Sequence, residues 1–427
     1  MTLYINNATY IDWRDLSVTA AHIRVDEGKT GCIQFLDEAP GPESLNDSDT
    51  VIDAAGKVVT KSFGCGHHHI YSTLARGMPA PAKAPQNFTQ ILEYVWWHLD
   101  KNLDMEMIRA SAQAAALFCA KNGVTFVIDH HASPFAVEGS LFTVQEAFDR
   151  VGLSHMLCYE ISDRDGEKIG KQGLEETRQY LSAGHQGHVG LHASFTVGAP
   201  LLEQAVAMAE RFNTGVHIHV AEDLADQVHC KETYGRRVIE RLKEAGALDL
   251  NGSILGHCVH LDDRERDLLK YSAAWVVQNV ESNLNNNVGV TGYASHGNRI
   301  MLGTDGMHSD MLRSAKAAFF MGQGTEGISF PGIYERFRGI HQYLEQVNAQ
   351  GDGDNNLVIL DYETPTPMTS DNFLGHFVFG LESSHVDSVV SSGKLIVHHK
   401  KLVLASEDDI LGSAREMAVK LWEKLAG

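Results

Sequence analysis

The sequence lacks closely paired cysteines, long apolar runs and any excess of basic residues. It has no CxxC pair and no dense cysteine framework of the kind that staples small secreted domains. The six cysteines are scattered along the chain: Cys32, Cys65, Cys119, Cys158, Cys230 and Cys258. In a chain of 427 residues, this pattern is typical of reduced thiols in a cytosolic protein.

Signals for membrane insertion and secretion are also missing. No stretch approaches the ~20 consecutive apolar residues of a membrane span. The segment Met1–Asn7 has neither the basic start nor the apolar core of a signal peptide. These absences predict a soluble protein of the cytoplasm.

Basic charge is scarce. The chain carries 55 acidic against 35 basic residues, a formal net charge of −20, and no Lys/Arg-rich run offsets it locally. This balance argues against nucleic acid or an anionic membrane as a partner. Hydrophobic residues make up 43% of the chain, enough for a large core. The length exceeds one ordinary domain, although a (β/α)₈ barrel alone takes about 250 residues.

Short apolar runs of β character alternate with longer helical stretches after residue 57. A helical period is clear in Leu201–Ala209 and in Val238–Ala245. The eight apolar runs are Val58–Gly66, Val124–His131, Leu153–Glu160, His188–Phe195, Thr214–Glu222, Gly252–Val259, Ala273–Val280 and Asn298–Asp305. Strand–helix alternation predicts a parallel sheet, and eight units predict a closed α/β barrel over residues 58–353.

The two flanks of this region have a different pattern. Residues 1–57 are short alternating runs separated by turn residues, and much of 354–427 is also strand-like. We expect both ends to form one small β domain, with 351–356 as the linker that returns to it. A terminal helix is expected from Asp408 to Leu425.

Polar residues gather where the apolar runs end. The most distinctive segments are His67–His69, His217–Glu222, Gly256–His260 and Leu302–Gly306. Imidazoles and a carboxylate suit a borderline divalent ion, zinc or ferrous iron. A carboxylate three residues beyond a ligand can carry protons to and from water on such an ion. The set predicts a metallohydrolase with one metal ion.

These segments together resemble the amidohydrolase superfamily over nearly the whole chain. The resemblance is closest to the cytosine-deaminase/triazine-hydrolase (TRZ/ATZ-like) branch and its SsnA-like aminohydrolases. The motifs that carry it are HxH at 67–69, HxHxxE at 217–222, GHCVHL at 256–261 and LGTDGM at 302–307. The resemblance implies a distorted (β/α)₈ TIM barrel with a small composite β-sandwich domain.

The resemblance also implies roles for single residues. The metal ligands would be His67, His69, His219 and Asp305. Glu222 would shuttle protons, His257 would hydrogen-bond the activated water, and Asp305 would take that water's proton. The fourth run has no lysine near its end, where relatives with two metal ions place a carboxylated one, so a single ion is expected.

Several side chains keep a second interpretation. Glu222 could cap the next helix, and Asp305 could be a turn residue. His192 and His130 are candidate substrate contacts, and each could instead support a neighbouring group. We expect His217 to lie behind the metal ligands and His260 to be structural. Tyr94, Trp96 and Trp97 lie in a long insertion after the first strand and could close over a flat ring, but their helical spacing favours packing in the core.

The predicted reaction is hydrolysis of an amidine-like C–N bond in a nitrogen heterocycle, such as a purine, pyrimidine, pterin or triazine, with release of ammonia. The same site could instead cleave a cyclic amide or displace halide. An inactive metal-binding or scaffold subunit is the alternative of another class. Zinc is the expected ion, with ferrous iron as the alternative. We also expect a homo-oligomer, a dimer or higher.

Overall fold

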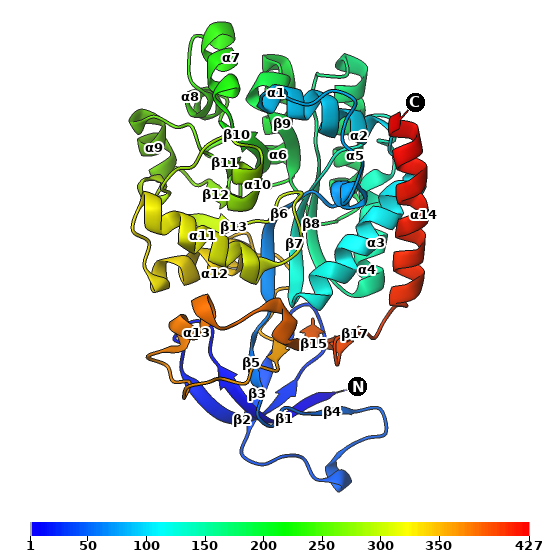
Figure 1. Ribbon diagram of the computed structural model, residues 1–427, viewed down its shortest axis with the longest axis vertical. Helices are drawn as coiled ribbons and strands as arrows, with labels where there is room; N and C mark the ends of the chain where they lie inside the picture. The colour runs from blue at the N-terminus through cyan, green and yellow to red at the C-terminus, as the bar shows by residue number, and fades with distance from the viewer. Residues whose placement is uncertain (1, 427) are drawn as a thin grey trace.

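The computed structural model describes residues 2–426 (Figure 1). A helix-rich α/β unit forms the upper part of the molecule in this view, and a sheet built from both ends of the chain lies below it. No helix among the described residues is both long and apolar enough to cross a membrane.

Eight parallel strands occupy the centre of the α/β unit. They form a three-stranded sheet and a five-stranded sheet. The first contains β6 (Phe63–His68), β7 (Val124–His131) and β8 (Ser154–Tyr159), and the second contains β9 (Val189–Ala193), β10 (Val216–Val220), β11 (Ile254–His257), β12 (Trp275–Gln278) and β13 (Ile300–Leu302). Isolated parallel bridges connect the two sheets at both edges, Leu157 to Gly187 and Ile161 to Leu191 on one side and His68 to Asp305 on the other. The expected α/β architecture with parallel strands is confirmed.

Helices follow the strands in sequence and surround them in space (Figure 1). They are α1 (Phe88–Ile91), α2 (Trp97–Lys101), α3 (Met105–Lys121), α4 (Ser140–Val151), α5 (Glu167–Ser182), α6 (Ala199–Arg211), α7 (Leu224–Tyr234), α8 (Val238–Glu244), α9 (Asp263–Lys270), α10 (Val280–Asn285), α11 (Met311–Thr325) and α12 (Phe330–Gln346). Their apolar faces cover the strands, and β7 and β10 are buried at every position. Burial on both faces explains why these strands appear in the sequence as continuous apolar runs.

The first predicted strand is in fact two. Residues Val58–Lys61 form β5, which pairs with β1 and β14 in the terminal sheet, and β6 begins at Phe63. The amide of Ser62, between them, donates to the carbonyl of Asn356 at 3.0 Å. The change of sheet therefore falls at Ser62, a few residues after the expected boundary at 57.

The terminal sheet has nine strands from the two ends of the chain. Its order is β17-β16-β15-β14-β5-β1-β2-β3, with β4 paired to β1. Their bounds are β1 (Leu3–Ile11), β2 (Val18–Val25), β3 (Ile33–Leu36), β4 (Thr50–Asp53), β14 (Leu357–Leu360), β15 (Val386–Ser391), β16 (Lys394–His398) and β17 (Lys401–Leu402), beside β5. A separate apolar cluster that includes Ile5, Ile23, Val59 and Ile359 is buried against this sheet.

Two helices follow strands of the terminal sheet in sequence. The short α13 (Phe373–Phe379) lies beside α12, and α14 (Glu407–Ala426) ends the described chain. The expected terminal helix is confirmed. It leaves the terminal sheet and packs against α3 of the α/β unit (Figure 1), where the indole nitrogen of Trp422 donates to the carbonyl of Leu74 at 2.9 Å.

Candidate active site

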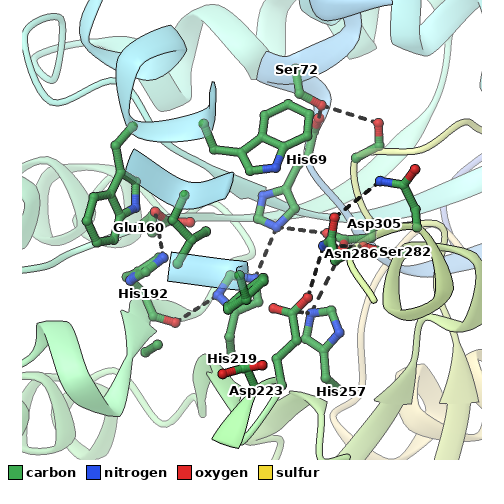
Figure 2. Close-up of a pocket in the computed structure, with 18 of the residues that line it drawn as sticks. His69, Ser72, Glu160, His192, His219, Asp223, His257, Ser282, Asn286 and Asp305 are labelled. Atoms are coloured by element: carbon green, nitrogen blue, oxygen red, sulfur yellow. Dashed lines mark hydrogen bonds and ion pairs between the residues drawn. The ribbon is translucent and has the colours of Figure 1, made fainter. Parts of the chain in front are cut away.

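A cavity opens at the carboxyl ends of the parallel strands (Figure 2). Four residues at these ends have left-handed backbone conformations although none is glycine: Ala221 (φ 45°), His257 (φ 68°), Cys258 (φ 53°) and Asp305 (φ 52°). Such conformations cost energy for ordinary residues and are concentrated at functional sites. In parallel α/β folds, active sites also form at this end of the strands.

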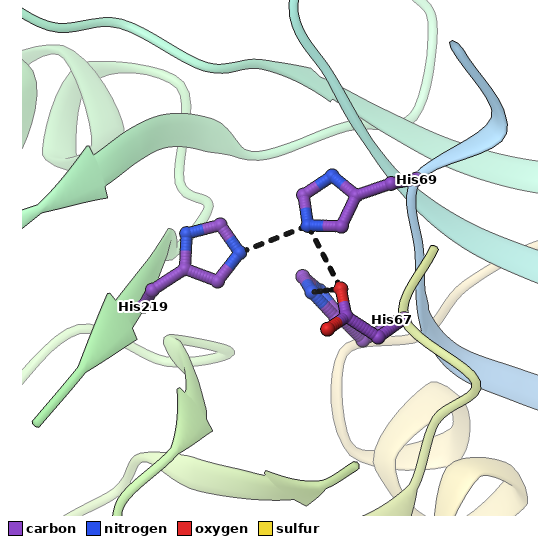
Figure 3. Close-up of side chains that lie close together, drawn as sticks. His67, His69 and His219 are labelled. Carbon is purple, nitrogen blue, oxygen red and sulfur yellow. Dashed lines mark hydrogen bonds and ion pairs between the residues drawn. The ribbon is translucent and has the colours of Figure 1, made fainter. Parts of the chain in front are cut away.

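Four side chains converge at the base of the cavity, from β6, β10 and the turn after β13. The ligand-type atoms of His67, His69, His219 and Asp305 all lie within 4.8 Å of one another. Figure 3 shows the three imidazoles turned toward a common point. The Nε2 atoms of His69 and His219 are 3.0 Å apart, and Asp305 Oδ1 lies 3.0 Å from His69 Nε2 and 3.4 Å from His67 Nε2.

Hydrogen bonds fix which nitrogen of each imidazole faces inward. His69 Nδ1 lies 2.7 Å from the carbonyl oxygen of His130, and His219 Nδ1 lies 2.7 Å from that of His192. A carbonyl only accepts, so both Nδ1 atoms carry the proton, and each neutral ring presents a bare Nε2 to the centre. Two facing lone pairs at 3.0 Å repel unless a cation or a proton lies between them.

His67 completes the same pattern through a second histidine. Its Nδ1 lies 2.9 Å from Nε2 of His217, while its buried Nε2 has no hydrogen-bond partner. His217 thus lies behind the converging imidazoles and orients one of them, as metal-binding histidines generally require. Three directed imidazole nitrogens and one carboxylate fit a divalent ion of the zinc type.

Two further groups lie beside this cluster. His257, at the end of β11, places Nε2 3.6 Å from Glu222 Oε2 and 4.0 Å from Asp305 Oδ2. Its Nδ1 is 2.7 Å from the amide oxygen of Asn283, so Nδ1 carries the proton. Asn286 donates to Glu222 Oε1 at 3.2 Å. Both carboxylates and His257 line the cavity, so a substrate can reach all three.

Burial and charge set the protonation of these groups. Burial and the neighbouring imidazoles hold the pKa of His219 well below its usual range. Burial acts to raise the pKa of Asp305, but the adjacent imidazoles of His67 and His69 outweigh it and hold that pKa well below the usual range. Metal ligation requires this combination of a neutral imidazole and an ionised carboxylate. Burial raises the pKa of Glu222, although His257 opposes the shift, so Glu222 holds a proton more readily than an exposed glutamate.

Aromatic side chains form another wall of the cavity, contributed mainly by the segment that connects β6 to α3. Phe88, Trp96 and Trp97 line the cavity, together with Phe195 beyond β9. Both tryptophans are half-buried: they pack against apolar clusters, as expected, and they also line the cavity. Residues Leu92–Trp96 form a π-helical turn between short helices, and this segment lies over the cavity, where its inner face meets open space.

The two expected substrate contacts have different positions. His192 lines the cavity, with Nδ1 2.6 Å from Thr196 Oγ1. His130 is fully buried and is not among the lining residues; its Nδ1 lies 3.2 Å from Glu160 Oε2. Glu160 itself lines the cavity (Figure 2), so the carboxylate and not His130 is the exposed member of the pair.

Other polar residues singled out in the sequence point elsewhere. His68 alternates to the opposite face of β6 and bonds Ser309 Oγ at 2.8 Å, and His260 bonds the carbonyl of Val288 at 2.6 Å. Glu160 directly follows β8 and is one of the polar strand ends apparent in the sequence, although nothing in the sequence assigned it a role. Sequence reasoning missed Asn286, which lies beyond α10 and has no comparable signal.

The model of the amidohydrolase family matches residues 58–330. This span is well over half of the chain and contains every residue of the converging cluster. The chain belongs to the amidohydrolase family, hydrolases that act on C–N bonds.

Relatives of similar length match over almost the entire chain. A 5′-deoxyadenosine deaminase of Methanopyrus kandleri is 28% identical, over 94% of this chain and 95% of the relative. A 5-methylthioadenosine/S-adenosylhomocysteine deaminase of Syntrophomonas wolfei is 25% identical, over 91% of this chain and 92% of the relative.

Solved structures agree on the fold at lower identity. An adenosine deaminase of Xanthomonas campestris with bound zinc has a TM-score of 0.83 at 16% identity, covering 98% of each chain. The atrazine chlorohydrolase TrzN of Arthrobacter aurescens, complexed with zinc, has a TM-score of 0.81 at 16% identity, covering 97% of this chain and 100% of its own. These likenesses show a TIM-barrel-like α/β fold.

Proposed function

We propose that the protein is a mononuclear metal-dependent deaminase that hydrolyses the exocyclic C–N bond of an amidine-like ring and releases ammonia. One observation carries the proposal. The donor atoms of His67, His69, His219 and Asp305 converge within 4.8 Å, and Glu222 and His257 lie beside them in a cavity with aromatic walls.

We assign the four converging residues as ligands of a single zinc ion. The directed Nε2 atoms and the ionised Asp305 support this set, and three nitrogens with one oxygen suit zinc. The site has no carboxylated lysine in reach of a second ion, because the residue at the end of β9 that faces the cavity is His192. Zinc in two solved relatives supports the choice of ion.

A divalent ion in this position lowers the pKa of bound water from ~15.7 toward ~7 and so supplies a nucleophile at neutral pH. Asp305 Oδ2, which faces His257, accepts the proton that water loses. The protonated Glu222 donates its proton to the ring nitrogen next to the attacked carbon and then takes up the proton of the added hydroxyl, while the proton held by Asp305 passes to the amino group, which leaves as ammonia. His257 donates no proton; its Nε2 orients the attacking water by accepting a hydrogen bond.

The relatives direct the choice of substrate class. Their names specify 5′-deoxyadenosine, methylthioadenosine and S-adenosylhomocysteine, all adenine nucleosides. We propose an adenine nucleoside without a 5′-phosphate as the substrate. The aromatic wall formed by Phe88, Trp96, Trp97 and Phe195 supports a flat ring as ligand.

We also propose that the eight parallel strands close into a distorted barrel and that the terminal segments form one composite β-sandwich domain. The bridges at both sheet edges support closure. The separate apolar cluster of the terminal strands supports an independent core. In this organisation α14 belongs to the barrel, whose helix α3 it covers.

The test is ammonia release from 5′-deoxyadenosine, methylthioadenosine and S-adenosylhomocysteine by the zinc-loaded protein. Atrazine and dihydrouracil, run in parallel, test halide displacement and cyclic-amide cleavage at the same site. The proposal predicts ammonia from at least one nucleoside and loss of that activity in Glu222→Gln. Chloride from atrazine or ring opening of dihydrouracil, with no ammonia from any nucleoside, would establish an alternative reaction. No turnover of any compound would favour the scaffold interpretation.

A further inference from the structure

The charged groups that line the cavity are all acidic. Glu160, Glu222, Asp223, Asp226 and Asp305 contribute carboxyl groups, and no lysine or arginine is among the lining residues of the described chain. An anionic substrate would therefore find no lysine or arginine in the cavity, and the proposed zinc ion at its base would already be paired with the carboxylate of Asp305. Contact between like charges costs several kcal/mol and serves to exclude wrong ligands.

Four of these carboxyl groups already have partners or tasks. Asp305 belongs to the converging cluster, and Glu222 accepts from Asn286. Asp226 uses both oxygens, one on the amide of Phe195 and one on that of Ala221. Asp223 caps α7 by accepting from Ala225 at 2.8 Å. The remaining carboxylate is Glu160.

Glu160 is buried beside His130, and its Oε1 has no hydrogen-bond partner among the described residues. Its side chain is 3% exposed, and Oε2 lies 3.2 Å from Nδ1 of His130. Oε1 is 3.9 Å from Nε2 of His192 and 4.0 Å from Nη1 of Arg164, both beyond hydrogen-bond distance. A buried ionised carboxylate without a second donor is costly, so a donor from a bound molecule would be favourable.

The nearby arginine does not cancel this acceptor. Arg164 pairs with Asp100 and, at 3.1 Å, with Asp165, and its guanidinium carbon lies 5.2 Å from the ring of Trp97. Lys101 adds a pair with Asp165 at 2.7 Å. Two cations therefore face three carboxylates, counting Glu160, and the group as a whole retains negative charge.

We propose that Glu160 selects the substrate: its free Oε1 accepts a hydrogen bond from an N–H or O–H group of the bound molecule, and the cavity admits neutral or cationic molecules while excluding anionic ones. The inference rests on the proposed deamination for its substrates and extends it to their charge. Nδ1 of His130 lies 3.2 Å from Oε2 of Glu160, and Nε2 of His192, another residue of the cavity lining, lies 3.9 Å from Oε1.

The experiment compares kcat/KM for three compounds that share the adenine ring and differ in charge: 5′-deoxyadenosine, S-adenosylhomocysteine and adenosine 5′-monophosphate. For the wild type we expect the phosphate compound to be at least about 100-fold poorer than 5′-deoxyadenosine. Glu160→Gln keeps the shape and removes the charge. It should lower kcat/KM for 5′-deoxyadenosine by about 10- to 100-fold, mainly by raising KM. The ratio of kcat/KM for 5′-deoxyadenosine to that for adenosine 5′-monophosphate should fall by at least about tenfold.

Two further variants separate charge from reach. Glu160→Asp keeps the charge but withdraws the acceptor, so it should lose affinity for 5′-deoxyadenosine and still reject the phosphate. Glu167→Gln removes an exposed carboxylate of α5 that does not line the cavity, so its kcat/KM should stay within about threefold of the wild type. If Glu160→Gln does not fold or loses metal, Glu160→Asp carries the test.

The donor on the substrate can belong to the ribose or to the ring. If it is a ribose hydroxyl, 2′,5′-dideoxyadenosine or 3′,5′-dideoxyadenosine should be a poorer substrate for the wild type, and the loss should nearly vanish in Glu160→Gln. If both deoxy compounds lose equally in wild type and variant while Glu160→Gln still weakens binding, the donor is the exocyclic amino group, because the adenine ring of a nucleoside carries no ring N–H. Both results support the selecting role of Glu160.

The proposal would be overturned if both Glu160 variants kept the wild-type KM for 5′-deoxyadenosine and the wild-type preference for it over adenosine 5′-monophosphate. A wild type that prefers the phosphate compound would also overturn it. A wild type that deaminates none of the nucleosides contradicts the proposed function instead. Charge selection is then measured by calorimetric binding of 2-aminobenzimidazole and benzimidazole-5-carboxylate. Equal wild-type affinities for these two rings would overturn the selection by charge, and a preference for the amine that Glu160→Gln abolishes would support it.

Discussion

At the scale of single residues, Asp305 combines two tasks. Its Oδ1 faces His67 and His69, as a ligand would, and its Oδ2 faces His257 and the cavity. The left-handed backbone at this position turns the side chain into the cluster. Substitutions that remove one task or both therefore give different results.

Asp305→Asn retains an oxygen that can coordinate but cannot take a proton, and Asp305→Ala removes both functions. We expect the asparagine variant to retain more zinc than the alanine variant, and both to lose nearly all turnover even with zinc in excess. Parallel zinc titrations and rate measurements test this. An active, metal-replete Asp305→Ala protein would contradict the assigned role.

Glu222→Gln tests proton transfer separately from binding, since glutamine keeps the size and the contact with Asn286. Zinc content should be unchanged, while turnover should fall by at least about 100-fold, the lower range for general acid–base catalysis. Normal turnover of the same substrate by the purified variant would leave Glu222 with only a structural role.

At the scale of elements, a buried ion pair anchors the junction between the terminal sheet and the α/β unit. Lys61, the last residue of β5, places Nζ 3.1 Å from Asp352 Oδ1, and His341 of α12 places Nδ1 2.8 Å from Asp352 Oδ2. Burial acts to raise the pKa of Asp352, but His341 and Lys61 outweigh it and lower that pKa to about 2. Burial lowers the pKa of Lys61 in spite of Asp352, so the pair is stable only as a unit.

The sign of the pH dependence follows from the lowered pKa of Asp352. Its folded pKa of about 2 lies below the ordinary 3.8, so the stability it adds is complete above pH 4 and is lost as pH falls toward 2. This contribution is about 2 kcal/mol. Asp352→Asn should lower the free energy of unfolding by about 3–5 kcal/mol at pH 7 and flatten its acid dependence.

Denaturant unfolding at several pH values between 3 and 7 measures this effect. Asp354→Asn is the matched control, because that side chain is 48% exposed and its pair with Arg14 lies at the surface. The control should change stability by less than about 1 kcal/mol. An Asp352→Asn protein as stable as the control would show that the pair is not an anchor.

The same junction shows what the sequence could predict about elements. The eight apolar runs were enough to predict the parallel strands, because strands that are buried on both faces are apolar at nearly every position. Lys61 and Ser62 visibly interrupt the first run, but the sequence cannot show that the interruption separates two sheets, because the partners that fix it, Asn356 and Asp352, lie far along the chain. Helical spacing likewise cannot distinguish core packing of Trp96 and Trp97 from closure over a ligand, since only the three-dimensional position reveals that this segment covers a cavity.

At the scale of the whole molecule, the cavity draws on strands far apart in sequence. Spacing motifs predicted the converging histidines and Asp305, because strand ends of a parallel sheet meet at one edge. They could not show whether His130 or Glu160 contacts the substrate, because this depends on which of the two side chains lines the cavity. The central claim is that this edge holds one catalytic divalent ion.

Zinc titration of the metal-free protein, with ammonia release from 5′-deoxyadenosine as the readout, tests that claim most directly. The account predicts that activity rises linearly and levels off at one equivalent of zinc per chain. It also predicts that His67→Ala and His219→Ala neither bind zinc tightly nor gain activity. A break at two equivalents, full activity of the metal-free protein, or tight binding of one zinc ion by both histidine variants would contradict it.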